Sequence, residues 1–436
     1  MSATETTNTQ TTNTKPEQTT KETEIKVSVV IPVYNCEEHL RETLDGVVAQ
    51  TLGDIEVILV DDGSTDSSPE ILKEYEDKYK DKNKKIKVLR QQNQYAGIAR
   101  NNGMQHAKGE YLVFWDSDDI FAPNALETLY NRAKETDSDI TICNADHLDM
   151  DTGKIMHPTY YIAKGKYPKD KEVFSMEDIP DRILNFTPVA VWHKMYRKDF
   201  VKENNLTFQG TPSGNDIYFS ILALCLAKRI SIADEVLVTY RKFSKTGLTG
   251  TLSKNPKDGI YAWYTTAKEL KNRGVFPRVS FANRAMENTV FQLRNLPDID
   301  AFTEAINYLK EGPIEAYGLT DLTEDEYITR WHYDFAKMLR DDTAKDIYAW
   351  LRMRDYHAMV RQTNEITDLK KKLNAEKKKN KDLEAKAKKQ EAKLTRDLEK
   401  ANKTIQDIRN SKAYKLGKFF AYIPRKIKDA FRHKDK

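Results

Sequence analysis

The chain lacks any apolar run long enough to cross a membrane. Its longest such segments are Val27–Val33 and Ile221–Ala227, far short of the ~20 apolar residues that a span needs. Residues 1–24 hold ten threonines and lack the apolar segment of a secretory signal. We therefore expect neither an integral membrane protein nor a secreted one.

Cysteine is also scarce. The three cysteines, Cys36, Cys143 and Cys225, share no metal-binding spacing and lie beside apolar segments. We interpret them as reduced core residues rather than metal ligands or disulfide partners, which indicates a cytosolic protein. Hydrophobic residues form only 39% of the 436 residues and charged residues 32%, so part of the chain is expected to be a tail or a solvated helix.

An excess of positive charge is confined to one end of the chain. The net charge is +7 over residues 411–436, +7 over residues 357–410 and −10 over the first 356 residues. A mildly acidic body argues against a nucleic-acid enzyme, and no nucleic-acid partner is expected. A basic tail favours contact with an anionic surface.

Short apolar segments alternate with segments of helical periodicity between residues 25 and 145. Pro32 is expected to end the first strand, because proline cannot donate a ladder hydrogen bond. This alternation predicts an α/β fold with a doubly wound, mostly parallel sheet. The expected strands are Val27–Val33, Ile55–Val60, Ile86–Arg90, Tyr111–Trp115 and Ile140–Asn144, with helices at Glu37–Gln50, Ser68–Tyr79 and Ile98–Ala107.

Polar residues follow three of these strands where each strand ends. In parallel sheets the carboxyl ends of the strands meet at one edge, where ligands bind. We therefore expect these side chains to form one site, although turns and helix caps also use aspartate. They are Tyr34 and Asn35, Asp61 and Asp62, and Asp116 and Asp118.

The remainder of the chain divides by composition. Residues 366–416 contain neither glycine nor proline, and Ile366, Leu369 and Leu373 have coiled-coil spacing, which resumes out of phase at Leu394. A coiled coil that forms homo-oligomers and a single solvated helix both remain open. The expected parts are a disordered tail (1–24), the α/β domain (25–255), a helical domain (256–356), the long helix (357–410) and a basic amphipathic tail (411–436).

Several segments together carry a resemblance to a known family. They are VSVVIPVYN (Val27–Asn35), VDDGSTD (Val60–Asp66), ARNNG (Ala99–Gly103) and AKGEY followed by WDSDD (Ala107–Asp119). In order and spacing they resemble family 2 inverting glycosyltransferases with the GT-A fold, and among these the bacterial cell-surface polysaccharide and teichoic-acid enzymes. The resemblance covers residues 26–254.

The resemblance implies a donor site for a UDP-sugar and a divalent cation, Mn²⁺ or Mg²⁺. Asp118, with Asp116, would bind the cation, since Mg²⁺ and Mn²⁺ prefer a few oxygen ligands together with substrate phosphates. Asp116 would also meet the ribose, and Asp62 the uracil base. The other implied nucleotide-sugar residues are Pro32, Tyr34, Asn35, Asp61, Asn93, Arg100 and Arg241. An Asx turn at residues 61–62 and a surface ion pair at Arg100 are the alternatives.

Inversion needs a general base that deprotonates the acceptor hydroxyl. The family places the base in a Glu-Asp pair, and here Asn215 and Asp216 occupy that position, so Asp216 is the candidate base and Asn215 an acceptor contact. A role for Asp216 only as a helix N-terminal residue remains open. His193 is a second candidate acceptor residue, or else a packed histidine. No histidine lies close to Arg241 in the sequence, so Arg241, Ser244 or Lys245 would meet the diphosphate.

The basic tail resembles those of bacterial glycosyltransferases that act on lipid-linked acceptors. Leu416, Phe419, Phe420 and Ile423 can share one face of a helix, with lysines around it. We expect a peripheral enzyme on the cytoplasmic face of the membrane that extends a glycan or lipid-linked glycan; the alternative is a tail packed on the body. Other possibilities are a protein (adhesin) glycosyltransferase and an inactive scaffold that assembles through the coiled coil. A processive polymerase is disfavoured, because the sequence has no membrane-spanning segments.

Overall fold

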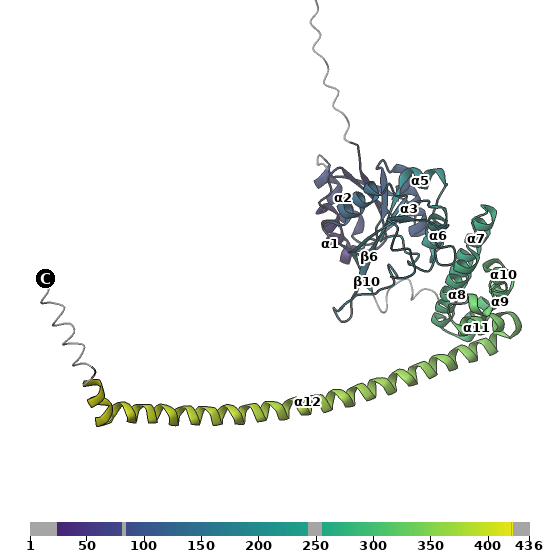
Figure 1. Ribbon diagram of the computed structural model, residues 1–436. Coiled ribbons are helices and arrows are strands. Elements are labelled where there is room, and N and C mark those ends of the chain that lie inside the picture. The colour runs from purple at the N-terminus through teal and green to yellow at the C-terminus, as the bar shows by residue number, and fades with distance from the viewer. Residues whose placement is uncertain (1–23, 81–83, 243–254, 420, 422–436) are drawn as a thin grey trace, which may run out of the picture. The chain divides into compact units, whose positions relative to one another are not determined.

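The computed structural model describes residues 24–80, 84–242, 255–419 and 421, and these form two compact units, residues 1–351 and 352–436 (Figure 1). The strands are β1 (Val27–Val33), β2 (Ile55–Asp61), β3 (Lys85–Arg90), β4 (Tyr111–Phe114), β5 (Ile120–Phe121), β6 (Ile140–Asp149), β7 (Ile155–Met156), β8 (Val173–Phe174), β9 (Lys194–Arg197) and β10 (Ile230–Lys242). The helices are α1 (Glu37–Val48), α2 (Ser68–Tyr79), α3 (Tyr95–His106), α4 (Ala125–Glu135), α5 (Lys198–Glu203), α6 (Asn215–Leu226), α7 (Asp258–Asn272), α8 (Arg278–Asn295), α9 (Ile299–Lys310), α10 (Pro313–Tyr317), the 3₁₀ turn η2 (Glu324–Glu326), α11 (Arg330–Asp341) and α12 (Ala344–Asn410).

One mixed sheet forms the centre of the first unit. Its strand order is β3-β2-β1-β4-β9-β6-β10-β5. Strands β3, β2, β1 and β4 are parallel, and β6 and β10 form a second parallel pair. The short strand β9 lies antiparallel between β4 and β6, so β4 and β6 point the same way and their carboxyl ends share one edge.

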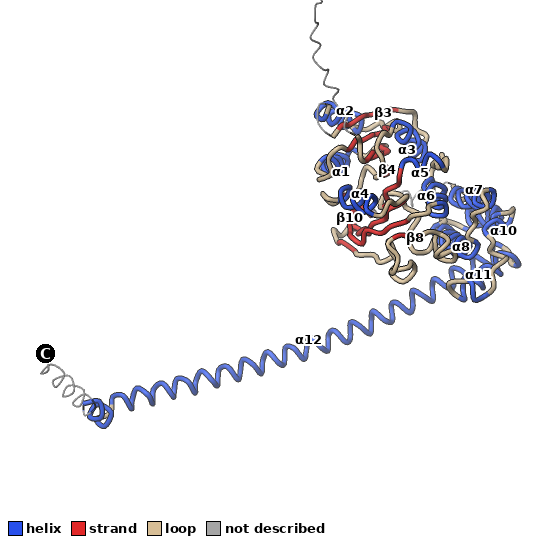
Figure 2. Tube along the Cα trace, turned by 45° about the horizontal axis from the view of Figure 1, so that its top comes forward, coloured by secondary structure: helices blue, strands red, loops and turns tan. Residues whose placement is uncertain are grey.

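Alternate residues of the strands bury against different helices, as the two-residue period of a strand requires. Val29 and Ile31 of β1 pack in a cluster with apolar residues of α1, α2 and α4, while Val30 joins a second cluster with α5 and α6. Figure 2 shows helices on both sides of the strands. The sheet is therefore covered on both faces, which explains its nearly continuous apolar strands.

The second apolar cluster continues into α7–α11. It includes Trp263 of α7, Phe281 of α8 and Phe335 of α11, all fully buried, and ends with Ile347 and Leu351 in the first turns of α12. One core therefore crosses the boundary expected near residue 255. In Figure 2, α7 lies next to α6.

The second unit consists of α12 from residue 352 onward and a further helical stretch over residues 412–419. The residues expected to form a coiled-coil seam are exposed in the single chain: Ile366, Leu369, Leu373, Leu394, Leu398, Ile405 and Ile408. Within the described residues, no helix has the length and apolar character of a membrane span.

The expected strands and helices of the α/β region are present. Strand β6 extends five residues beyond Asn144, and no counterpart was expected for the strands β5, β7, β8, β9 and β10 or the helices α4 and α5. Strand β1 has the expected bounds, Val27–Val33, but Pro32 does not end its ladder, because Val33 is still in register with Asp61. Val30 O accepts from Trp115 N and Val33 O from Asp62 N, so the Pro32 nitrogen faces the β4 side beyond the last β1–β4 pair, where it costs no ladder hydrogen bond.

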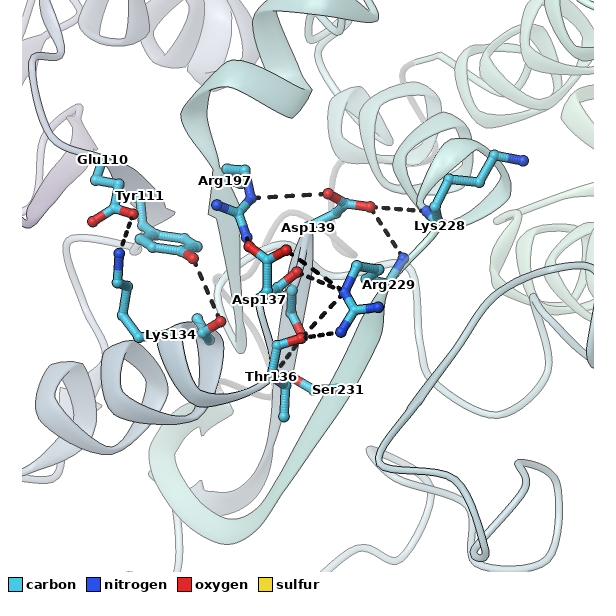
Figure 3. Close-up of polar contacts among 12 residues, drawn as sticks. Glu110, Tyr111, Lys134, Thr136, Asp137, Asp139, Arg197, Lys228, Arg229 and Ser231 are labelled. Atoms are coloured by element: carbon cyan, nitrogen blue, oxygen red, sulfur yellow. Dashed lines mark hydrogen bonds and ion pairs between the residues drawn. The ribbon is translucent and has the colours of Figure 1, made fainter.

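Charged side chains join the strands at the sheet edge opposite the polar clusters. Asp139 accepts hydrogen bonds from the backbone N–H groups of Lys228 and Arg229, which precede β10, and Asp137 pairs with Arg197 at the end of β9 at 2.6 Å (Figure 3). These contacts of Asp137 and Asp139 hold separate chain segments together. We interpret this edge as structural.

Candidate active site

The loops after β1, β2 and β3 are joined by polar contacts at the carboxyl edge of the sheet. Asn35 Oδ1 accepts from Thr65 N at 2.8 Å, and Asp62 Oδ1 accepts from Gln91 Nε2 and Gln94 N at 2.8 and 2.9 Å. Gly63 has φ +80°, and a Cβ there would approach the backbone N of Asn93 to 3.0 Å. The clusters at residues 34–35 and 61–62 therefore lie side by side at this edge.

The two aspartates after β2 are both buried but have different partners. Asp61 Oδ1 accepts from Ser64 N at 2.8 Å, and its Oδ2 lies 3.2 Å from Arg90 Nε. Asp61 therefore closes its own turn, whereas Asp62 reaches the β3–α3 loop. The alternative of an Asx turn therefore applies to Asp61 rather than to Asp62. Pro32 lies within β1, and the rings and amides of Tyr34, Asn35 and Asn93 are exposed at the same edge.

Three carboxylates crowd the loop after β4. Burial, followed by the charge of Asp116, raises the pKa of Asp118 to about 6. Burial and the charges of Asp116 and Asp118 raise the pKa of Asp119 well above its usual value. Arg241, on β10, opposes both shifts: its N–H donates to Asp119 Oδ1 at 3.0 Å and its Nη1 to the Asp118 carbonyl, while Nη2 pairs with Glu42 of α1.

This loop fits a divalent cation held jointly with a substrate. No three His, Cys, Asp or Glu side chains in the described part of the chain are arranged to hold a metal by themselves. Mg²⁺ and Mn²⁺ commonly use one or two carboxylates and complete their shell with phosphates and water. Asp118 is buried beside the charge of Asp116, the two causes that raise its pKa, and a bound cation would lower the pKa again. Ser244 and Lys245 lie outside the described residues.

Arg100 links the aspartate loop to helix α6. This arginine is 5% exposed, its Nη2 donates to Asp116 Oδ1 at 2.5 Å and its Nη1 to Asn215 Oδ1 at 2.8 Å. Its guanidinium also lies over the Phe208 ring, 5.5 Å from the centroid. Arg100 is thus neither a surface ion pair nor turned toward open solvent, and Asn215 is engaged by it through Oδ1.

Asp216 lies in the first turn of α6, directly after the residue that Arg100 holds. The helix starts after Gly214, whose φ of +66° suits glycine. Burial raises the pKa of Asp216, helped by Asp116 and opposed by Arg100 and Lys194. These four groups therefore share one electrostatic environment, in which a carboxylate is closer to protonation than usual.

His193 is fully buried, which contradicts its assignment as an acceptor contact. Its Nε2 lies 3.1 Å from Thr187 Oγ1 and 3.0 Å from Lys194 Nζ. The alternative, a packed histidine, is the correct one, because its ring is enclosed by Tyr161 and Trp192.

The sequence prediction missed Lys194, a fully buried lysine behind Asp216. Its Nζ donates to the carbonyls of Pro188 and Ala190 at 2.7 and 2.6 Å. Burial lowers its pKa well below the usual value, with the charge of Asp216 in opposition. Its apolar neighbours Trp192 and Met195 are the signal in the sequence that separates it from the many exposed lysines of the chain.

Comparisons with known proteins agree with this geometry. Residues 28–202 match the family model described as glycosyl transferase family 2. The chain is 33% identical to a Bacillus subtilis protein named as glycosyltransferase EpsH (56% of this chain, 69% of that protein) and 32% to the cholesterol galactosyltransferase of Borreliella burgdorferi (58% and 69%). It is 37% identical to a poly(ribitol-phosphate) beta-glucosyltransferase of Bacillus spizizenii, over 48% of this chain and 31% of that protein.

The fold also matches a solved structure. S. aureus TarS, residues 1–349, in complex with UDP-GlcNAc, superposes with a TM-score of 0.61 at 22% identity, over 77% of this chain and 92% of that chain. The expected GT-A fold is confirmed. The chain belongs to glycosyltransferase family 2, and its relatives include enzymes of teichoic-acid and polysaccharide synthesis.

Proposed function

We propose that this enzyme is an inverting, metal-dependent glycosyltransferase that transfers a sugar from a UDP-sugar to a growing bacterial surface glycan, such as an exopolysaccharide, capsule or teichoic acid. The position of Asp116 supports this most. Its charge acts on the candidate metal ligand Asp118 and on the candidate base Asp216, and its carboxylate pairs with Arg100. Donor and acceptor chemistry would therefore meet at one point.

The donor would lie along the carboxyl edge of β1–β4. Asp62 is suited to the uracil imide N–H, and the TarS structure with UDP-GlcNAc favours a uridine nucleotide for this fold. Asp118, with Asp116, would hold Mn²⁺ or Mg²⁺, and the bound cation supplies positive charge against the diphosphate. Arg241 would support this loop from behind, through the Asp118 carbonyl, rather than bind phosphate itself.

Asp216 would act on the acceptor. Its carboxylate accepts the proton of the acceptor hydroxyl as the hydroxyl oxygen bonds to the anomeric carbon and the bond to UDP breaks. Arg100 would fix the start of α6 relative to Asp116, so that base and donor keep their spacing.

A screen of nucleotide sugars tests this proposal. We expect the full chain to release UDP slowly from at least one of UDP-glucose, UDP-galactose, UDP-GlcNAc and UDP-GalNAc in Mn²⁺ or Mg²⁺, and faster when poly(ribitol phosphate) or a lipid-linked saccharide is the correct acceptor. GDP-mannose is the control. Release or binding of no UDP-sugar would contradict the proposal and favour the inactive scaffold.

We also propose that the basic tail holds the enzyme on the cytoplasmic face of the membrane. Residues 412–419 are helical, with Tyr414, Leu416 and Phe419 exposed, and each Lys near anionic lipid contributes about 1 kcal/mol. The remaining members of the expected apolar face, Phe420 and Ile423, lie outside the described residues.

Truncation after Arg409 is expected to abolish sedimentation with phosphatidylglycerol vesicles while UDP-sugar hydrolysis continues. Binding of the intact chain should also fall as salt rises, because salt screens the charges. The matched comparison changes three lysines to glutamine, either Lys412, Lys415 and Lys418 or Lys377, Lys378 and Lys379. Only the first set should weaken vesicle binding; equal binding by the intact and truncated chains would indicate a tail packed on the body.

A further inference from the structure

A group of aromatic side chains lies on the half of the sheet that the donor would leave free. Tyr240 of β10 is in register with His147 of β6, and the next residue, Arg241, donates its N–H to Asp119. The charges of Asp119, Asp116 and Asp118, after burial, raise the pKa of Tyr240. The ring of Tyr240 therefore borders the aspartate loop.

The rings form a continuous series from that loop outward. Tyr240 stacks on Trp192 with centroids 5.6 Å apart and planes 5° apart, and Trp192 contacts Tyr161 at 5.2 Å. Tyr160 then packs on Tyr161 at 4.9 Å. Tyr161 and Trp192 are buried, whereas Tyr160 is 51% exposed. We name these four residues the aromatic series.

The exposed ring of Tyr160 is held in place. Its hydroxyl lies 3.1 Å from His147 Nε2, which also lies 2.8 Å from the hydroxyl of the buried Tyr161. An exposed side chain with no function usually keeps its rotamer freedom. A ring fixed before a ligand arrives loses less entropy on binding, which favours affinity.

The place of the series in the fold indicates its occupant. The nucleotide residues, such as Asp62, lie at the end of β2, whereas Tyr240 belongs to β10, on the other side of β4 in the strand order. The other three rings of the series pack outward from Tyr240. The series thus leads from the aspartate loop to an exposed ring on the side of β4 away from the nucleotide residues, which leaves it open to an acceptor.

We propose that the Tyr160 ring, at the outer end of the aromatic series, is an acceptor subsite that stacks against the C–H face of a sugar ring in the acceptor glycan. Sugar rings present apolar C–H faces to aromatic planes and polar hydroxyls at their edges. The assignment of the occupant as acceptor rests on the proposed function, since it requires the donor to lie on β1–β4.

Saturation-transfer NMR on the full chain with UDP tests the subsite, with methyl β-glucoside, methyl β-galactoside and chitobiose as probes. We expect saturation of the sugar C–H protons of at least one probe, lost in Tyr160→Ala and kept in Tyr160→Phe, which retains the ring. Once an acceptor substrate is known, Tyr160→Ala should raise its KM about 3- to 10-fold, without a matching rise in the KM for donor.

Tyr261→Ala is the matched control, because Tyr261 is a similarly exposed tyrosine (47%) on α7. It should leave saturation of the probes unchanged. Equal saturation in Tyr160→Ala and wild type, or none in wild type, would overturn the subsite. The UDP signals in the same samples separate the two proposals: saturated UDP without saturated sugar refutes only the subsite, whereas no UDP signal refutes the proposed donor site.

Discussion

Replacement of Asp216 by asparagine is expected to lower sugar transfer by roughly 10²–10⁴-fold while the affinity for the UDP-sugar stays near its wild-type value. An amide of the same shape cannot accept the acceptor proton. The donor contacts lie on other elements, at the ends of β2 and β4. Steady-state transfer kinetics together with calorimetric titration of UDP would measure the two quantities separately.

Asp300→Asn is the matched control, because Asp300 is an exposed aspartate in the first turn of α9. The alternative role of Asp216 is only a favourable interaction of its carboxylate with the dipole at the start of α6. In that case both substitutions would cost about 0.3–1 kcal/mol of stability and little activity. Parallel collapse of UDP binding and transfer in Asp216→Asn would instead make Asp216 a donor-site or structural residue.

The raised pKa of Asp216 gives the expected pH dependence its sign. The base must be ionised, so transfer should fall as pH drops through a midpoint above ~3.9, the ordinary pKa of aspartate. Because the folded-state pKa is raised, the stability from the protonated carboxyl is present at low pH and lost as pH rises through the folded pKa. The neutral amide of Asp216→Asn should therefore melt no lower than wild type at neutral pH.

The sequence predicted those parts of the site that depend on local pattern. Strand period and the parallel arrangement were enough to predict Asn35, Asp62 and Asp118 at one edge, because each lies in the loop that follows a parallel strand. Lys194 and strand β9 could not be predicted this way. β9 has four residues, and its nearest paired residue, Ile142, lies 52 positions from Lys194, so no local periodicity marks it.

The sequence also could not predict which groups the buried polar side chains contact. Arg100 is well suited to a phosphate by its chemistry alone, yet its two terminal nitrogens donate to Asp116 and Asn215. Asn215 departs from the glutamate expected in the family, and its amide oxygen still provides the acceptor that Arg100 needs. The departure therefore preserves the link between α3 and α6 while removing one negative charge beside Asp216.

Asp118→Asn is expected to remove most transfer activity and the Mn²⁺-dependent part of UDP binding. A neutral amide is a poor ligand for a hard divalent cation, so the variant should no longer hold Mn²⁺ together with the diphosphate. Calorimetry would measure the dissociation constant of UDP once in Mn²⁺ and once in EDTA. In the variant the two dissociation constants should be equal.

Asp137→Asn controls for the loss of one carboxylate, because Asp137 lies at the opposite edge of the sheet, beside Arg197 (Figure 3). It should leave the Mn²⁺ dependence intact. Full activity of the wild-type chain in EDTA would refute the metal site. In that case Arg100 and Arg241, the two cations already beside the aspartate loop, would have to offset the diphosphate charge, although each is engaged by protein carboxylates.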